Sequence, residues 1–108
     1  MFNSEPHILV PKSAKAGDVI TIKVLIGHAM ETGLRTDERG QVIPRKIVNR
    51  FVCRYGDVEV FCADLHESVA ANPYFEFYIE ATASGILEFL WEEDGGQFAR
   101  VQHPLVVA

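Results

Sequence analysis

Apolar side chains recur at every second position in several stretches of this chain. In residues 19–26 each even position is aliphatic, and in residues 74–80 Phe and Ile alternate with Tyr and Glu. Residues 87–92 repeat the alternation, apart from Leu90. Because successive side chains of a strand point to opposite faces, each stretch predicts a β-strand with one buried face.

Turn-forming residues separate these stretches at positions 17–18, 82–85 and 94–96, which gives about seven short strands. No segment has the periodicity of a long helix, although residues 67–72 would fit one short helical turn before Pro73. Seven short strands in a chain of 108 residues predict an all-β fold, an immunoglobulin-like β-sandwich. We expect a single domain over residues 1–108.

A two-residue turn at residues 56–57 fixes the register of a predicted hairpin. Tyr55 then lies opposite Val58, and Arg54 faces Glu59 as an opposite-charge pair on the outer face. The other face of the hairpin is apolar in this register. The agreement between the charge pairing and the apolar pairing supports this register.

The same register places Cys53 opposite Val60 and Cys62 opposite Phe51, on one face. Such diagonal neighbours are roughly 7–8 Å apart, farther than a disulfide spans, so two buried free thiols are expected. A reactive or intermolecular thiol is the alternative. It favours Cys53, since nearby cations stabilise a thiolate. The cations near Cys53 in the sequence are Arg45, Lys46, Arg50 and Arg54.

One long irregular segment runs from residue 28 to residue 44. Loops of this length without regular structure are uncommon in compact domains and are often functional. The alternative is a solvated excursion of a hairpin. Met30 favours a function, because a flexible thioether suits an adaptable partner surface.

Composition and charge exclude several classes of protein. An apolar content of 48% fits a folded domain, and a formal charge of −5 argues against nucleic-acid binding. No apolar run approaches the about 20 residues of a membrane-spanning helix. Residues 1–10 lack the apolar core of a signal peptide, which taken alone favours the cytoplasm.

The residues that carry enzyme chemistry are sparse. Cys62 and His66 lack the downstream methionine of a typical copper site, and adding Cys53 gives no common zinc spacing. No nucleophilic serine motif or phosphate-binding glycine loop occurs, and the carboxylates of residues 92–94 are expected to face solvent at a turn. We therefore expect no catalytic residue, metal or cofactor, and a binding role.

Three stretches of the chain form a distinctive series. Residues 10–20 read Val-Pro-Lys-Ser-Ala-Lys-Ala-Gly-Asp-Val-Ile, and residues 28–35 read His-Ala-Met-Glu-Thr-Gly-Leu-Arg and lead to residues 43–47. Residues 61–66 read Phe-Cys-Ala-Asp-Leu-His and are followed by Ala-Asn-Pro-Tyr at residues 71–74. In this order and spacing the stretches resemble the SoxZ family of sulfur-oxidation proteins over nearly the whole chain, and the loop motif and Ala-Asn-Pro-Tyr are the more specific.

The resemblance implies an immunoglobulin-like subunit that is not an enzyme and that forms a heterodimer with SoxY. SoxY carries sulfur intermediates on a cysteine of its C-terminal arm during periplasmic thiosulfate oxidation. This chain is then expected to be the non-catalytic partner of a SoxYZ-like carrier complex. A periplasmic place would require export with the partner, because no signal peptide is present.

The long loop is the candidate surface for a SoxY-like protein and for the other Sox enzymes. Its candidate partner-binding residues are His28, Met30, Glu31, Thr32, Arg35, Pro44 and Arg45. We expect no nucleic-acid or membrane partner. An exposed partner-binding surface on the isolated chain would favour a homodimer.

Three other functions fit the same residues. The chain could be a subunit of a related carrier pair that serves another oxidation system, such as one with quinoprotein dehydrogenases. Gene neighbourhood would distinguish this case from thiosulfate oxidation. A small redox or metal enzyme would use Cys53 or Cys62, which metal analysis and thiol titration would reveal. A sandwich adhesion module is the third.

Overall fold

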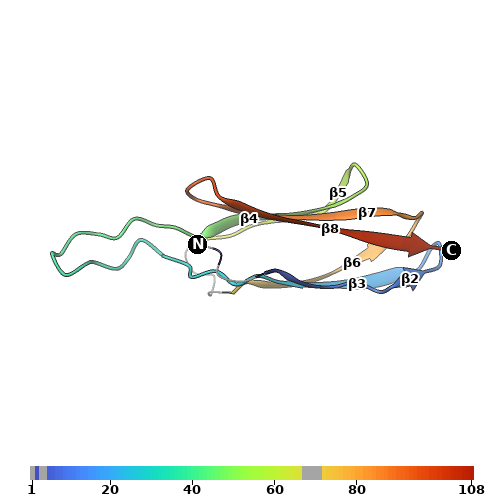
Figure 1. Cartoon of the computed structure of the whole chain (residues 1–108), viewed down its shortest axis with the longest axis horizontal. Coiled ribbons are helices and arrows are strands. Elements are labelled where there is room, and N and C mark those ends of the chain that lie inside the picture. The colour runs from blue at the N-terminus through green and yellow to red at the C-terminus, as the bar shows by residue number, and fades with distance from the viewer. Residues whose placement is uncertain (1, 3–4, 67–71) are drawn as a thin grey trace.

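A computed structural model describes residue 2 and residues 5–66 and 72–108, and within them eight strands form two packed sheets (Figure 1). The strands are β1 (His7–Leu9), β2 (Ser13–Ala14), β3 (Val19–Leu25), β4 (Val48–Tyr55), β5 (Val58–Asp64), β6 (Tyr74–Glu80), β7 (Gly85–Glu93) and β8 (Phe98–Val107). The short turn expected at residues 67–72 lies, apart from Asn72, outside the described residues.

The order of strands is β1-β3-β6 in one sheet and β2-β8-β7-β4-β5 in the other. Neighbouring strands are antiparallel, except that β2 runs parallel to β8. The predicted all-β sandwich is confirmed. The short strands β1 and β2 join different sheets. Pro11 lies between them and cannot donate a ladder hydrogen bond.

The alternating residues of the central strands form the core between the sheets. Ile22 and Val24 on β3 face Phe51 on β4 and Phe89 and Trp91 on β7, and all five are buried. The ring of Phe51 lies at the centre of an aromatic cluster, with its centroid 5.0 Å from those of Phe75 and Trp91. Since Phe75 belongs to β6 and Trp91 to β7, this ring joins the two sheets.

The hairpin of β4 and β5 has the predicted turn but a different register beyond it. Tyr55 pairs with Val58 and Arg54 with Glu59, as predicted, and a bulge then shifts the ladder between Cys53 and Arg54. The bulge inserts one residue, so that Cys53 pairs with Phe61 and Cys62 with Val52. The predicted ladder partners of Cys53 and Cys62 are therefore wrong. The two cysteine side chains lie on opposite faces of the sheet.

Candidate partner-binding site

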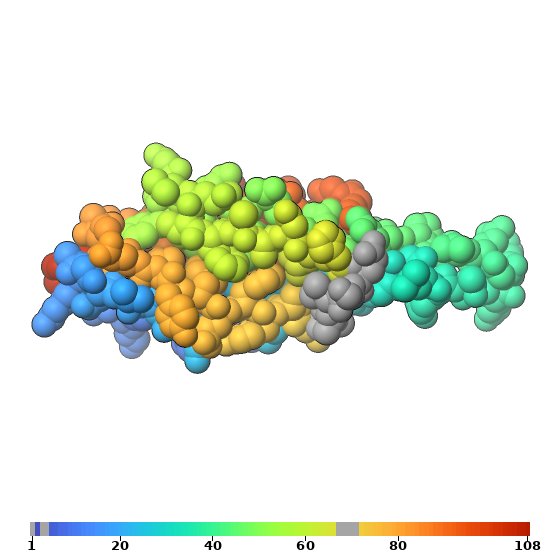
Figure 2. All heavy atoms as spheres, turned by 180° about the vertical axis from the view of Figure 1, so that it is seen from behind, coloured from blue at the N-terminus to red at the C-terminus, as the bar shows by residue number. Residues whose placement is uncertain are grey.

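Residues 31–46 form a hairpin that projects from one end of the sandwich, and we call them the protruding hairpin (Figures 1 and 2). Backbone bridges join Glu31 to Lys46 near the root and Thr36 to Val42 near the tip. The molecule measures 60 × 20 × 20 Å along its principal axes, and the hairpin supplies much of that length. The segment contains no regular strand, as expected, and isolated bridges arrange it as a hairpin, which was the alternative interpretation.

The tip of the protruding hairpin is a closed turn. The Asp37 carboxylate accepts hydrogen bonds from the backbone N–H groups of Arg39 at 2.8 Å and Gln41 at 3.0 Å. The N–H of Gly40, whose φ is +77°, donates to the Asp37 carbonyl at 3.0 Å. An aspartate that caps its own turn and a glycine in the left-handed region fix the tip before any partner binds.

One face of the protruding hairpin is apolar and exposed. Leu34 is 83% exposed and Val42 64% exposed. Val42 pairs with Thr36, and the alternation of extended strands places Leu34 and Pro44 on the same face. These exposed aliphatic residues make this face the candidate contact surface of the hairpin. Sequence reasoning missed Leu34 and Val42, although two aliphatic residues inside a polar loop were the available signal.

Asp94 holds the C-terminal root of the hairpin. Its carboxylate accepts two hydrogen bonds from the Arg45 guanidinium, both at 2.8 Å, one from the Ile47 N–H at 3.1 Å and one from the Asn49 amide at 3.0 Å. Burial alone raises the pKa of Asp94, but the hydrogen bonds from Asn49, Arg45 and Ile47 outweigh it and lower that pKa. Asp94 is therefore an ionised acceptor with four donors.

Glu93 and His28 form a buried pair between the two sheets. His28 Nε2 lies 2.6 Å from Glu93 Oε2, and both side chains are fully buried. The Lys46 ammonium lies 3.8 Å from the other Glu93 oxygen. The expectation that residues 92–94 all face solvent is wrong for Glu93, because it follows Trp91 on the inward face of β7.

Burial lowers the pKa of His28, against the opposing hydrogen bond with Glu93. Burial raises the pKa of Glu93, but hydrogen bonds to its carboxylate, that from His28 included, leave the pKa below its ordinary value. Both pKa values are lowered, which fits a neutral imidazole that donates a hydrogen bond to an ionised carboxylate. The pair is thus a structural link in which the carboxylate of Glu93 carries the charge and the imidazole of His28 is neutral.

The predicted contact residues fall into two groups. Met30 packs against the core and its sulfur lies 3.3 Å from the Val48 nitrogen, while His28 is buried. The remaining predicted residues lie along the hairpin or its root: Glu31, Thr32, Arg35, Pro44 and Arg45. Arg35 donates to Glu31 at 3.1 Å, which lowers the pKa of Glu31, and Thr32 accepts from the Leu34 N–H at 3.2 Å. The structure thus buries His28, leaves Met30, Glu31 and Thr32 half-buried, and exposes Arg35, Pro44 and Arg45.

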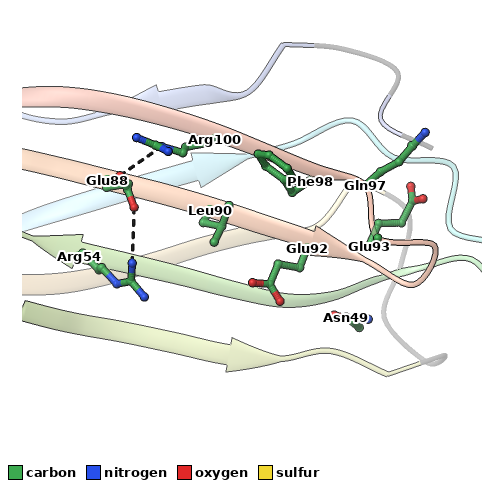
Figure 3. Close-up of a pocket in the computed structure, with 10 residues that line it drawn as sticks. Asn49, Arg54, Glu88, Leu90, Glu92, Glu93, Gln97, Phe98 and Arg100 are labelled. Carbon is green, nitrogen blue, oxygen red and sulfur yellow. Dashed lines mark ion pairs between the residues drawn. The ribbon is translucent and has the colours of Figure 1, made fainter.

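The outer face of the five-stranded sheet has a shallow hollow of about 430 Å³ beside the turn between β7 and β8 (Figure 3). Glu88 lies between two guanidinium groups, 3.7 Å from Arg54 and 3.2 Å from Arg100. Leu90 and Phe98 also line the hollow. The two arginines thus balance Glu88, while Glu92 adds a further carboxylate to the lining of the hollow.

The two thiols differ sharply in their surroundings. Cys53 is fully buried and burial raises its pKa to about 12, whereas Cys62 is exposed on the outer face. They form no disulfide. The cations that favoured a reactive Cys53 bind carboxylates instead, as Arg50 does with Glu59 at 3.6 Å. Desolvation therefore decides against a Cys53 thiolate.

We predict that one thiol of the native protein reacts rapidly with Ellman's reagent and that the second reacts only after unfolding. The Cys62→Ser variant should lose the rapid phase, because the thiolate of Cys53 is disfavoured and inaccessible. The Cys53→Ser variant is the matched control and should keep it. A rapid phase that persists in Cys62→Ser would contradict the burial of Cys53.

Metal-ligating side chains are scattered over the described residues. No group of three or more His, Cys, Asp or Glu side chains within them is arranged to hold a metal ion. In the same part of the chain, no helix has the length and apolar character needed to cross a membrane.

A family model described as sulphur oxidation protein SoxZ matches residues 8–103. The chain belongs to the SoxZ family. No curated protein matches the sequence. Among solved structures, this SoxZ-family chain is similar to a superoxide reductase (neelaredoxin) from Ignicoccus hospitalis, with a TM-score of 0.74 and 13% identity over 97% of this chain and 81% of that one. It is also similar to the sulfur carrier protein SoxY from Chlorobium limicola f thiosulfatophilum, with a TM-score of 0.66 and 14% identity over 98% and 81% of the two chains.

At these identities the two likenesses show the fold alone. Within the SoxZ-family chain, the two more specific sequence motifs meet in space at the root of the hairpin. The N–H of His28 donates to the Asn72 side chain at 3.1 Å, and the Asn72 N–H lies 3.4 Å from the His28 carbonyl. Asn72 has a φ of +56°, a left-handed conformation that asparagine tolerates better than most residues. The motifs therefore build one structural unit.

Proposed function

We propose that this protein is the non-catalytic partner subunit of a SoxYZ-like carrier complex in thiosulfate oxidation. It binds a SoxY-like sulfur-carrier protein as a heterodimer and helps the carrier to dock with the other Sox enzymes. Membership of the SoxZ family over residues 8–103 carries the proposal. The similarity to a SoxY structure supports a carrier built from two subunits of one fold.

We assign partner contact to the protruding hairpin. Its tip is fixed by its own hydrogen bonds, so binding does not require the tip to become ordered. Its apolar face exposes Leu34 and Val42, where a partner would bury aliphatic area. The protein acts in the periplasm, to which it is carried by its exported partner. The isolated chain forms a homodimer through the surface that the partner covers.

We predict that the Leu34→Ser/Val42→Ser double variant binds the SoxY-like protein of the same organism at least about tenfold more weakly than the natural chain. Burial of two aliphatic side chains is worth more than the about 1.4 kcal/mol that a tenfold change requires. Co-expression with copurification establishes the complex, and isothermal titration with the isolated proteins measures its Kd.

The matched control is Val58→Ser. Val58 is as exposed as Val42, at 64%, but lies in the turn region at the other end of β4. We expect this variant to bind like the natural chain. Equal affinities for the hairpin variant and the natural chain would contradict partner contact through the protruding hairpin. The absence of any complex with the natural chain would overturn the proposed function itself.

A further inference from the structure

Two consecutive carboxylates at the end of β7 hold both strands of the protruding hairpin at its root. Glu93 binds His28, which precedes the outgoing strand, and lies 3.8 Å from Lys46 at the end of the returning strand. Asp94 binds Arg45 through both of its oxygens. We call Glu93 and Asp94 the acidic clamp. Arg45 and Lys46 belong to the hairpin and His28 precedes it, while Asn49 on β4 is a further donor to Asp94.

The acidic clamp sits on a rigid base. The Glu93 N–H donates to the Gln97 carbonyl at 2.9 Å and the Gly96 N–H to the Glu93 carbonyl at 3.0 Å, which closes the turn between β7 and β8. The Asp94 N–H donates to the Ile47 carbonyl at 2.9 Å, and Asp94 accepts from the Ile47 N–H in return. The clamp is therefore tied by backbone and side chain to the point where the hairpin rejoins the sheet.

Two glycines make room for these contacts. A Cβ on Gly33 would lie 3.1 Å from the Cβ of Arg45, and Gly33 has a φ of +84°. A Cβ on Gly95 would lie 3.1 Å from the Lys46 side chain. Both distances are tighter than most packing contacts, so a larger residue at either position would shift Arg45 or Lys46 by a few tenths of an ångström. The two glycines thus leave space for the cations at the root.

We infer that the acidic clamp is a positioning element: by holding Arg45, Lys46 and His28, Glu93 and Asp94 fix the direction in which the protruding hairpin presents Leu34 and Val42 to the partner. The inference rests on the proposed function of the hairpin. The clamp contacts no partner itself in this scheme. It acts on affinity through pre-organisation, because a hairpin that swings at its root loses conformational freedom on binding.

The test compares Asp94→Ala with Glu88→Ala. Both residues lie on or at the end of β7 and form ion pairs with arginine, but Glu88 pairs with Arg54 and Arg100 on the outer face, away from the hairpin. Amide hydrogen exchange by mass spectrometry reports the hairpin directly when the isolated protein is diluted until size-exclusion chromatography shows the monomer. We expect exchange in residues 31–46 to become at least about tenfold faster in Asp94→Ala, with the peptides of β3 and β7 unchanged, and no change in Glu88→Ala.

Affinity for the SoxY-like protein should fall by about fivefold or more in Asp94→Ala and stay unchanged in Glu88→Ala. Adding Asp94→Ala to the Leu34→Ser/Val42→Ser variant should cost little further affinity, because the clamp acts through the face that this variant has lost. A merely destabilised fold would give no such non-additivity. Arg45→Gln is the milder second variant, because Arg45 is exposed and its replacement removes only the bidentate pair with Asp94. It should also speed exchange in residues 31–46.

Unchanged exchange in residues 31–46 for both Asp94→Ala and Arg45→Gln would overturn the inference. So would unchanged affinity in Asp94→Ala when the hairpin-face variant binds weakly. A hairpin-face variant that binds as tightly as the natural chain, while Asp94→Ala still accelerates exchange, would leave the clamp in place and contradict the docking function instead. The two failures are thus distinguishable.

Discussion

Replacing Phe51 with alanine is expected to lower the free energy of unfolding by about 3–5 kcal/mol, the cost of emptying a buried aromatic site. Phe51 is fully buried, and its ring contacts Phe75 on one sheet and Trp91 on the other. Its loss leaves a cavity between the sheets that neither can fill without moving the other. Urea unfolding followed by far-ultraviolet circular dichroism measures the difference.

Phe98→Ala is the control for this effect. Phe98 lies at the start of β8 and is 64% exposed, so its removal should change the free energy of unfolding by no more than about 0.5 kcal/mol. The single tryptophan, Trp91, supplies a second probe by fluorescence. Equal costs for the two phenylalanine variants would show that the aromatic cluster is not the centre of the core.

The second large effect is expected at the pair of His28 and Glu93. Either His28→Leu or Glu93→Leu should cost about 3–5 kcal/mol, because each leaves the other polar group in a buried site without its partner in the pair. The double variant His28→Leu/Glu93→Leu should cost clearly less than the sum, since an apolar pair needs no hydrogen bond. A double-mutant cycle of urea unfolding at pH 7 measures the coupling, and additive costs would contradict a direct link.

The same pair sets the response to acid. The pKa of folded His28 lies below its ordinary value of 6.5, so below that pH the unfolded chain binds a proton that the folded chain does not. The pKa of folded Glu93 lies below its ordinary value of 4.5, and acts in the same direction at lower pH. Stability should therefore fall as the pH decreases from about 6.5, and the double leucine variant should show a shallower fall.

The strands were predictable because their alternation is strong and local. The even positions of residues 19–26 and the aromatic residues of β6 and β7 specify one buried face each, whatever the tertiary context. The bulge beside Cys53 was not predictable. Both registers pair apolar residues with apolar residues, and one inserted position decides whether Cys62 shares the buried face of Cys53.

The candidate site was predicted as a segment but not in its details. Motif and length pointed to the loop, yet Met30 turned out to pack against the core, while Leu34 and Val42 form the exposed face. Glu93 looked like a solvent-facing turn residue because carboxylates seldom lie inside. Its partner His28 is distant in sequence, and only the folding of the two sheets brings the pair together.

The protruding hairpin extends along the long axis of the molecule, not across either sheet (Figure 2). A protein that binds the protruding hairpin covers little of the sandwich body. Both broad faces and the far end, where β8 finishes, stay open to a different molecule at the same moment. The geometry thus allows a three-protein assembly in which this subunit is the bridge, and one contact need not be released before the next is made.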